Sequence, residues 1–148
     1  MSRLVEIQGD LFANTTKDDW LAQCISADFA MGAGIALQFN EQRNIRNGLK
    51  NKYGYHIMEV FKAKGPQVLE YNNVFNLVTK CECYTKPTLS ALCMTIQKMK
   101  MIAVTKGIKK ISMPRIGCGI DGLDWEQVKK AINCIFEESD IEVVVYYI

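Results

Sequence analysis

The sequence has few prolines, a single histidine and little net charge. Its 148 residues hold 3 prolines, and no proline- or serine-rich stretch marks a linker, so we expect one domain over residues 1–148. A net charge of +2 gives no strong electrostatic case for nucleic acid binding. No apolar run approaches the roughly 20 residues that span a bilayer, so we expect no membrane association.

The N-terminal segment Met1–Glu6 has no apolar signal region. We therefore expect a cytoplasmic protein, which in a eukaryote could also enter the nucleus. We also expect it to act as a monomer.

Cysteine and histidine are not arranged for zinc. Cys81 and Cys83 form a pair without a second pair at zinc spacing, and His56 has no ligand-like neighbour in sequence. Free thiols in apolar patterns behave as small hydrophobes, and three others lie in such patterns: Cys24, Cys93 and Cys134. We therefore predict reduced cysteines, with no metal and no cofactor.

Short apolar strands alternate with helical patterns along the chain, which predicts an α/β sandwich around a mostly parallel or mixed sheet. Helices are expected after the glycine turn at 31–34 and between Thr88, which would cap the helix, and Gly107. Another is expected from Asp124, where Gln127 would complete a capping box. The expected strands are 4–8, 20–26, 59–61, 67–71, 74–79, 111–113 and 141–148. In such folds, ligands bind beyond the carboxyl ends of the strands.

The segment 111–124 is the most informative part of the sequence. A short strand runs through Pro114 into three glycines, Gly117, Gly119 and Gly122, and then into a helix. Such glycine-rich turns let backbone N–H groups approach a phosphate closely. Asp121 would repel a phosphate, so its presence in the loop suggests chemistry on a phosphorylated sugar or nucleotide.

A second turn, Met31–Gly34, also joins a predicted strand to a helix, and Lys80 ends another strand. One crevice could therefore hold both turns and Lys80. Alone, Lys80 is more typical of a surface lysine, although a strand-end lysine in a dry crevice could be a nucleophile toward a sugar C1. Asp121 is equally consistent with a solvated and with a catalytic carboxylate.

Several other nucleotide motifs are absent. The chain has neither the dinucleotide fingerprint G-x-G-x-x-G near its N-terminus nor the P-loop. A cysteine-phosphatase loop would need an arginine six residues after its cysteine, but Asp124 follows Cys118 and Ala30 follows Cys24 at that distance.

Together these segments resemble the macrodomain, an ADP-ribose-binding module, and within it the terminal ADP-ribose protein glycohydrolase branch. The matching motifs run from about residue 4 to the C-terminus: Gly9–Phe12, Gln23–Asp28, Met31–Ala36, Leu77–Lys80, Lys86–Thr88, Met113–Asp121, Leu123, Trp125–Glu126 and Val145–Tyr146. The resemblance implies a single three-layer α/β/α domain with a central mixed sheet.

The resemblance also implies a role for each matching residue. Lys80 takes the place of the nucleophile and Asp121 that of the acid/base. Asp10 would bind the adenine amino group, supported by the backbone of Leu11, while Tyr146 and Ile148 would lie against the adenine. The other implied ligand-binding residues surround the distal ribose and the diphosphate: Ser26, Met31, Gly32, Ala33, Gly34, Ile35, Thr79, Pro114, Arg115, Ile116, Gly117, Cys118, Gly119 and Ile120.

The resemblance implies a hydrolase that removes ADP-ribose from Glu or Asp esters and from O-acetyl-ADP-ribose. Its partners would be ADP-ribose and ADP-ribosylated proteins, with nucleic-acid-linked ADP-ribose left open. Many macrodomains carry asparagines where this chain has Ser26-Ala27-Asp28, which favours a lysine mechanism over water activation. The alternatives are a non-enzymatic ADP-ribose reader and an ADP-ribose 1″-phosphate phosphatase.

Overall fold

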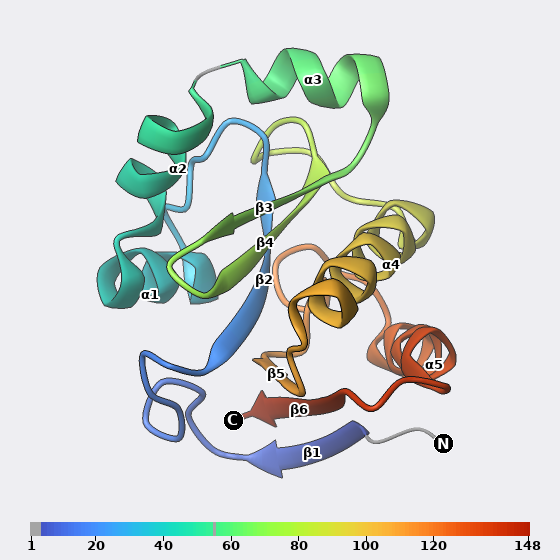
Figure 1. Ribbon diagram of the computed structural model, residues 1–148. Helices are drawn as coiled ribbons and strands as arrows, with labels where there is room; N and C mark the ends of the chain where they lie inside the picture. The colour runs from blue at the N-terminus through green and yellow to red at the C-terminus, as the bar shows by residue number, and fades with distance from the viewer. Residues whose placement is uncertain (1–3, 55) are drawn as a thin grey trace.

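The computed structural model describes residues 4–54 and 56–148, and it centres on one six-stranded sheet (Figure 1). The strand order is β1-β6-β5-β2-β4-β3, and only β3 runs antiparallel to its neighbour. The sheet is therefore mixed, as the sequence predicts. The strands are β1 Leu4–Gln8, β2 Trp20–Ser26, β3 Gln67–Tyr71, β4 Val74–Lys80, β5 Lys110–Met113 and β6 Glu142–Tyr147.

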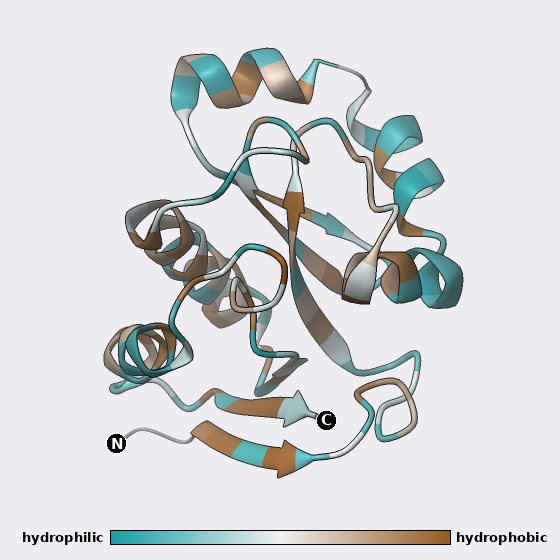
Figure 2. Cartoon of the chain, turned by 180° about the vertical axis from the view of Figure 1, so that it is seen from behind, coloured by the Kyte–Doolittle hydropathy of each residue, from teal (hydrophilic) through white to brown (hydrophobic). Residues whose placement is uncertain are grey.

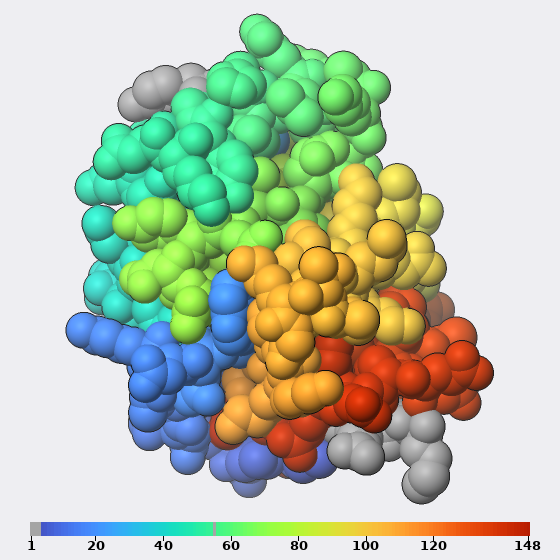
Figure 3. All heavy atoms as spheres, viewed as in Figure 1, coloured from blue at the N-terminus to red at the C-terminus, as the bar shows by residue number. Residues whose placement is uncertain are grey.

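Helices cover both faces of the sheet, which gives the expected α/β/α layers. One face carries α1 Gly34–Arg43, α2 Ile45–Tyr53 and α3 Ile57–Lys64, and the other carries α4 Leu89–Lys106 and α5 Trp125–Phe136. In Figure 3, α4 (yellow to orange) and α5 (red) pack side by side over their face. The single-domain expectation agrees with this arrangement, since one sheet joins both layers.

Each face of the sheet has its own apolar core, because successive strand residues point to opposite faces. In β4, Phe75 and Leu77 pack in the core beneath α4 and α5, whereas Val74 and Val78 pack in the core beneath α1 to α3. The central strands are largely hydrophobic along their length (Figure 2). Burial on both faces is what a central parallel strand requires.

The sequence located most elements but misread residues 45–64. A strand was predicted at 59–61, but the structure forms α3 there, so that prediction is wrong. The preceding helix α2 was not predicted, although Ile45, Gly48 and Leu49 are buried at helical spacing. Both helices are short and polar on their outer faces, so contact with the sheet rather than a strong local pattern stabilises them.

The two predicted helix caps differ in outcome. Thr88 precedes α4, and its side-chain oxygen accepts a hydrogen bond from the N–H of Ala91 at 3.0 Å, as predicted. Asp124 precedes α5, but its side chain makes no capping bond, so the predicted capping box with Gln127 is wrong. Asp124 instead lines the cavity described in the next section, on the loop that leads from β5.

Candidate active site

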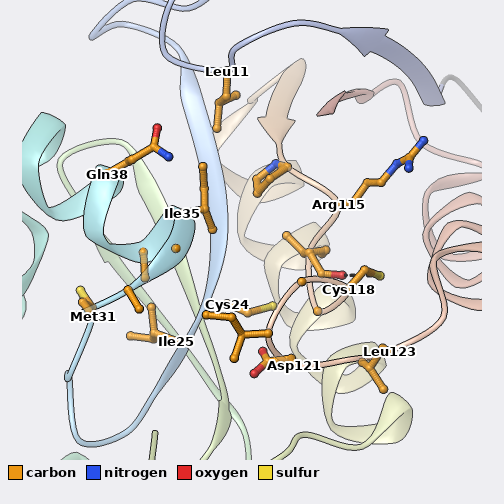
Figure 4. Close-up of a pocket in the computed structure, with 18 of the residues that line it drawn as sticks. Leu11, Cys24, Ile25, Met31, Ile35, Gln38, Arg115, Cys118, Asp121 and Leu123 are labelled. Carbon is orange, nitrogen blue, oxygen red and sulfur yellow. Dashed lines mark hydrogen bonds between the residues drawn. The ribbon is translucent and has the colours of Figure 1, made fainter. Parts of the chain in front are cut away.

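A cavity of about 890 Å³ opens at the carboxyl ends of β2, β4, β5 and β6. Its walls are the start of α1 on one side and the loop 114–124 on the other, as Figure 4 shows around Ile35 and Cys118. Parallel strands end at the same edge of a sheet, which is why segments far apart in sequence meet here. The two glycine turns and Lys80 share this cavity, as the sequence predicts.

The first wall of the cavity is the uncapped N-terminus of α1. The preceding residue, Ala33, has no side chain that could cap the helix, and no capping hydrogen bond forms there. The first N–H groups of a helix lack partners within it, and they carry partial positive charge. Gly34 and Ile35 line the cavity, so these N–H groups are placed to hold an anion.

The opposite wall is the glycine loop between β5 and α5. Gly117 has φ +75°, and a Cβ at this position would lie 3.0 Å from side-chain atoms of both Leu92 and Leu123. Only glycine combines this conformation with this space. Within the described residues, the N–H groups of Gly119 and Ile120 have no hydrogen-bond partner. Both residues line the cavity, so the loop presents a second set of donors for an anion.

Lys80 and Asp121 form an ion pair at the base of the cavity. Lys80 Nζ lies 2.7 Å from Asp121 Oδ1, and the side chains are only 10% and 16% exposed. Lys80 Nζ also donates a hydrogen bond to the backbone oxygen of Cys83 at 3.1 Å. The pair therefore sits between the two glycine loops, where water is largely excluded and charge interactions are stronger than in bulk solvent.

Lys86 links the segment after β4 to the glycine loop. Its Nζ donates a hydrogen bond to the backbone oxygen of Ile120. Lys86 lies on the segment after Lys80, and Ile120 lies in the glycine loop next to Asp121. This bond therefore helps to keep Lys80 and Asp121 close to each other.

Asp28 joins the turn 26–30 to the loop that follows β4, beside the site. Its Oδ1 accepts hydrogen bonds from Ser26 Oγ at 2.5 Å and from the N–H of Ala30 at 3.1 Å. Its Oδ2 accepts one from the N–H of Cys83 at 2.8 Å. Burial alone would raise the pKa of Asp28, but these hydrogen bonds outweigh it and hold the pKa below its usual value.

We expect Asp28→Asn to lower the free energy of unfolding at pH 7 by about 1 to 3 kcal/mol, because an amide cannot accept all these bonds. A lowered folded-state pKa stabilises the protein above the unfolded-state pKa, and that contribution disappears as the pH falls below about 4. Urea unfolding of both proteins at pH 7 and pH 3.5 tests this. Equal stability at pH 7 would contradict the role of Asp28.

Arg115 does not point into the cavity but away from it (Figure 4). Its guanidinium lies 3.2 Å from Glu6 Oε1 and stacks over the ring of Tyr147 at 4.3 Å. Glu6 also accepts hydrogen bonds from Trp125 Nε1 at 2.9 Å and Lys129 Nζ at 2.7 Å. Its pKa is lowered, chiefly by the bond from Lys129. The guanidinium is thus engaged at the rim, which leaves backbone N–H groups as the anion donors.

Two of the three cysteines that line the cavity, Cys24 and Cys118, are poor nucleophiles. Burial raises the pKa of Cys118 to about 11, with a further contribution from Asp124, and burial likewise raises the pKa of Cys24 well above its usual value. Only the thiolate form is nucleophilic. These two neutral thiols are therefore not nucleophile candidates.

The cavity gathers almost every residue that the sequence predicted for the site. Thr79 is the exception, because its side chain lies outside the cavity, toward α4. The other predicted site residues all line the cavity, and their catalytic and binding roles stay predictions. They are Asp10, Leu11, Ser26, Met31, Gly32, Ala33, Gly34, Ile35, Lys80, Pro114, Arg115, Ile116, Gly117, Cys118, Gly119, Ile120, Asp121, Tyr146 and Ile148.

Sequence reasoning missed three contributors to the site. Cys83 accepts a hydrogen bond from Lys80, Asp28 anchors the neighbouring turns, and Gln38 reaches the cavity from α1. In the sequence, the segment Ser26-Ala27-Asp28 stands out only because many macrodomains carry asparagines there. A carboxylate two residues after the end of a predicted strand was the available signal for Asp28, because such positions commonly cap turns.

Two further observations bear on earlier expectations. Within residues 4–54 and 56–148, no three His, Cys, Asp or Glu side chains converge as a metal site would require. In the same part of the chain, no helix is long and apolar enough to cross a membrane. Chemistry without a metal and the monomeric state stay predictions.

An α/β/α domain with two turns that offer backbone N–H groups and a Lys–Asp pair in one cavity fits a protein that binds a phosphorylated sugar or a nucleotide. The Macro domain family model matches residues 22–132. The chain belongs to the Macro domain family.

Named relatives agree with this assignment. The human ADP-ribose glycohydrolase OARD1 is 38% identical over 98% of this chain and 91% of its own. The DNA ADP-ribosyl glycohydrolase of Mycobacterium tuberculosis is 23% identical over 93% of this chain and 40% of its own. The macrodomain of Thermus aquaticus DarG superposes with a TM-score of 0.77 at 21% identity, covering 98% of each chain. That last likeness shows the fold.

Proposed function

We propose that this protein is an ADP-ribose glycohydrolase that releases ADP-ribose from carboxylate esters through Lys80 and Asp121. The contact of 2.7 Å between these side chains, in a cavity walled by two phosphate-binding turns, carries the proposal. The similarity to human OARD1, which is named an ADP-ribose glycohydrolase, supports it.

The ligand's diphosphate would lie between the two turns. The N–H groups of Gly119 and Ile120, unpaired within the described residues, and the uncapped N-terminus of α1 belong to opposite walls of the cavity. Both sets of donors are fixed by the fold, so binding costs little reorganisation. Held in this way, the diphosphate would place the distal ribose, with its C1, beside Lys80.

The reaction would begin when Asp121 accepts a proton from the Lys80 ammonium. The amine then attacks C1 of the distal ribose, a C–N bond forms, and the bond between C1 and the ester oxygen breaks. The Glu or Asp side chain leaves as a carboxylate, which needs no proton. Asp121 is next to the new bond and can move the protons through which water hydrolyses the lysyl–sugar adduct, releasing ADP-ribose and restoring Lys80.

The same attack serves any good leaving group on C1. O-acetyl-ADP-ribose fits because acetate leaves as readily as a side-chain carboxylate. Nucleic-acid-linked ADP-ribose is a further candidate, supported by similarity to a protein named a DNA ADP-ribosyl glycohydrolase. We propose ADP-ribosylated proteins as the principal partners.

The adenine end of the ligand would be held by Asp10. This side chain lines the cavity, and its Oδ1 already accepts a hydrogen bond from the N–H of Phe12 at 3.1 Å. That bond fixes the carboxylate, so the other oxygen is free to accept from the adenine amino group. Leu11, Tyr146 and Ile148 line the same end.

Asp10→Ala is expected to weaken ADP-ribose binding by about 1 to 3 kcal/mol, because a hydrogen bond to a charged acceptor is lost. Calorimetry on the free ligand measures the effect. Asp18→Ala, an exposed aspartate outside the cavity, is the matched control and should bind like the wild type. Unchanged affinity in the Asp10 variant would remove this residue from the site.

A reader that binds ADP-ribose without hydrolysing it is the second candidate function. The phosphate-binding turns would serve it equally, but it gives no reason for a shielded Lys80–Asp121 pair. A protein that binds ADP-ribose tightly and hydrolyses no ADP-ribosylated substrate would be such a reader. Release of phosphate from ADP-ribose 1″-phosphate would instead identify the third candidate, a phosphatase.

A further inference from the structure

The side-chain nitrogen of Lys80 is held by two acceptors from different segments. Nζ lies 2.7 Å from Asp121 Oδ1 and donates a hydrogen bond to the backbone oxygen of Cys83 at 3.1 Å. A lysine nitrogen is tetrahedral, with its carbon stem at one position and three positions for contacts. Because two of these are directed at acceptors, one position remains through which the amine could reach a sugar carbon.

The turn that carries Cys83 is held by hydrogen bonds and not by apolar packing. The N–H and the hydroxyl of Thr85 both donate to the oxygen of Glu82, at 3.1 Å and 2.8 Å. The two residues in the middle of this turn, Cys83 and Tyr84, are exposed, and Tyr84 is 80% exposed. The position of the Cys83 carbonyl therefore depends on polar contacts from outside the turn.

Asp28 makes such a contact. The N–H of Cys83 donates a hydrogen bond to Asp28 Oδ2 at 2.8 Å. The other carboxylate oxygen accepts hydrogen bonds from Ser26 Oγ at 2.5 Å and from the N–H of Ala30 at 3.1 Å. Ser26 is the last residue of β2, so Asp28 connects the turn to the end of a central strand. Hydrogen bonds to a charged acceptor are stronger than those between neutral groups.

We infer that Asp28 is a positioning residue for the nucleophile, an inference that rests on the proposed role of Lys80. Asp28 holds the N–H of Cys83, and the Cys83 carbonyl holds Lys80 Nζ beside Asp121. The amine thereby keeps the orientation from which it attacks C1. Asp28 itself does not line the cavity, so it acts through Lys80 and not by contact with the ligand.

Asp28→Ala is expected to lower kcat for a carboxylate-linked ADP-ribose conjugate about 10- to 100-fold, because misplacing a reacting group by about 1 Å can cost a factor of that order. Affinity for free ADP-ribose should stay near that of the wild type, since the donors to the diphosphate remain. Calorimetry gives this affinity and also the fraction of protein that binds. Rates divided by that fraction are not lowered by partial unfolding of the variant.

Asp28→Asn is the second variant, and it keeps the shape of the side chain if the alanine variant folds poorly. Its amide has one acceptor oxygen in place of two, so kcat should fall here as well. Asp19→Ala is the matched control for both. Asp19 also accepts a backbone N–H, that of Thr16 at 2.8 Å, and it pairs with Lys110 outside the cavity. Its variant should keep the wild-type kcat.

Two results with the Asp28 variants would overturn the inference. One is a wild-type kcat in both of them. The other is a loss of ADP-ribose affinity with an unchanged kcat, which would show that Asp28 acts on the anion-binding turn through Ala30 instead.

A double variant distinguishes this inference from the proposed function. In a protein that already carries Lys80→Ala, the added Asp28→Ala should not lower the residual rate further, because Asp28 acts through the Lys80 amine. An additional loss as large as in the wild-type background would overturn the inference alone. A wild-type protein that hydrolyses nothing, or a Lys80→Ala variant that hydrolyses normally, would refute the proposed function and this inference together.

Discussion

Lys80→Ala is expected to reduce hydrolysis of a carboxylate-linked ADP-ribose conjugate roughly 1,000-fold or more, because the nucleophile is removed. Affinity for free ADP-ribose should change little. We expect the diphosphate to be bound by backbone N–H groups at Gly119, Ile120 and the start of α1, and the substitution leaves these groups in place. Release of labelled ADP-ribose from an automodified protein measures the first quantity, and calorimetry measures the second.

Two controls separate chemistry from charge at this position. Lys80→Arg retains a cation that can pair with Asp121, but a guanidinium stays protonated and does not attack C1. It should therefore be as inactive as the alanine variant. Lys106→Ala removes an exposed lysine at the C-terminal end of α4 that pairs with Glu70. This variant should hydrolyse the conjugate at the wild-type rate. Wild-type rates in either Lys80 variant would show that the nucleophile is assigned wrongly.

Asp121→Ala is expected to reduce turnover about 100- to 10,000-fold, the usual range for loss of a positioned acid or base. The Lys80 amine can still attack C1 in this variant, but resolution of the adduct lacks its proton carrier and is slow. The variant should therefore accumulate ADP-ribose bound covalently to Lys80. Mass spectrometry of the denatured protein after incubation with substrate detects this added mass.

The double variant Lys80→Ala, Asp121→Ala is the control for the adduct, because it lacks the amine that would carry the sugar. Asp124→Ala changes another carboxylate that lines the cavity but contacts neither member of the pair, and it should form no adduct. If the Asp121 variant turns over at the wild-type rate, Asp121 has no part in the proton transfers.

Secondary structure was predictable from the sequence in some segments and not in others. Strands β2 and β4 and helix α4 carry strong local patterns, and their predicted bounds agree closely with the structure. The helix α3 was predicted as a strand because its eight residues are too few for periodicity to separate the two. The capping box at α5 also failed, since a side chain that can cap a helix can equally point into a neighbouring cavity.

The sequence by itself determined the two glycine turns. Gly117 and Gly34 have positive φ values of 75° and 60°. Such a conformation favours glycine regardless of the tertiary surroundings, so the sequence alone reveals it. Strand-to-helix order likewise placed both turns and Lys80 at one edge of the sheet. These inferences succeeded because they depend on residues close together in the chain.

Only the tertiary structure decided how side chains meet at that edge. Lys80 and Asp121 are 41 positions apart, and their contact depends on how the ends of β4 and β5 are aligned across the sheet. A register shift between β2 and β4 pairs Ser26 with Lys80, and Thr79 lies on the α4 side of β4 with Phe75 and Leu77. Arg115 turns to Glu6, 109 positions away. Such directions follow from packing between distant segments, which no local pattern encodes.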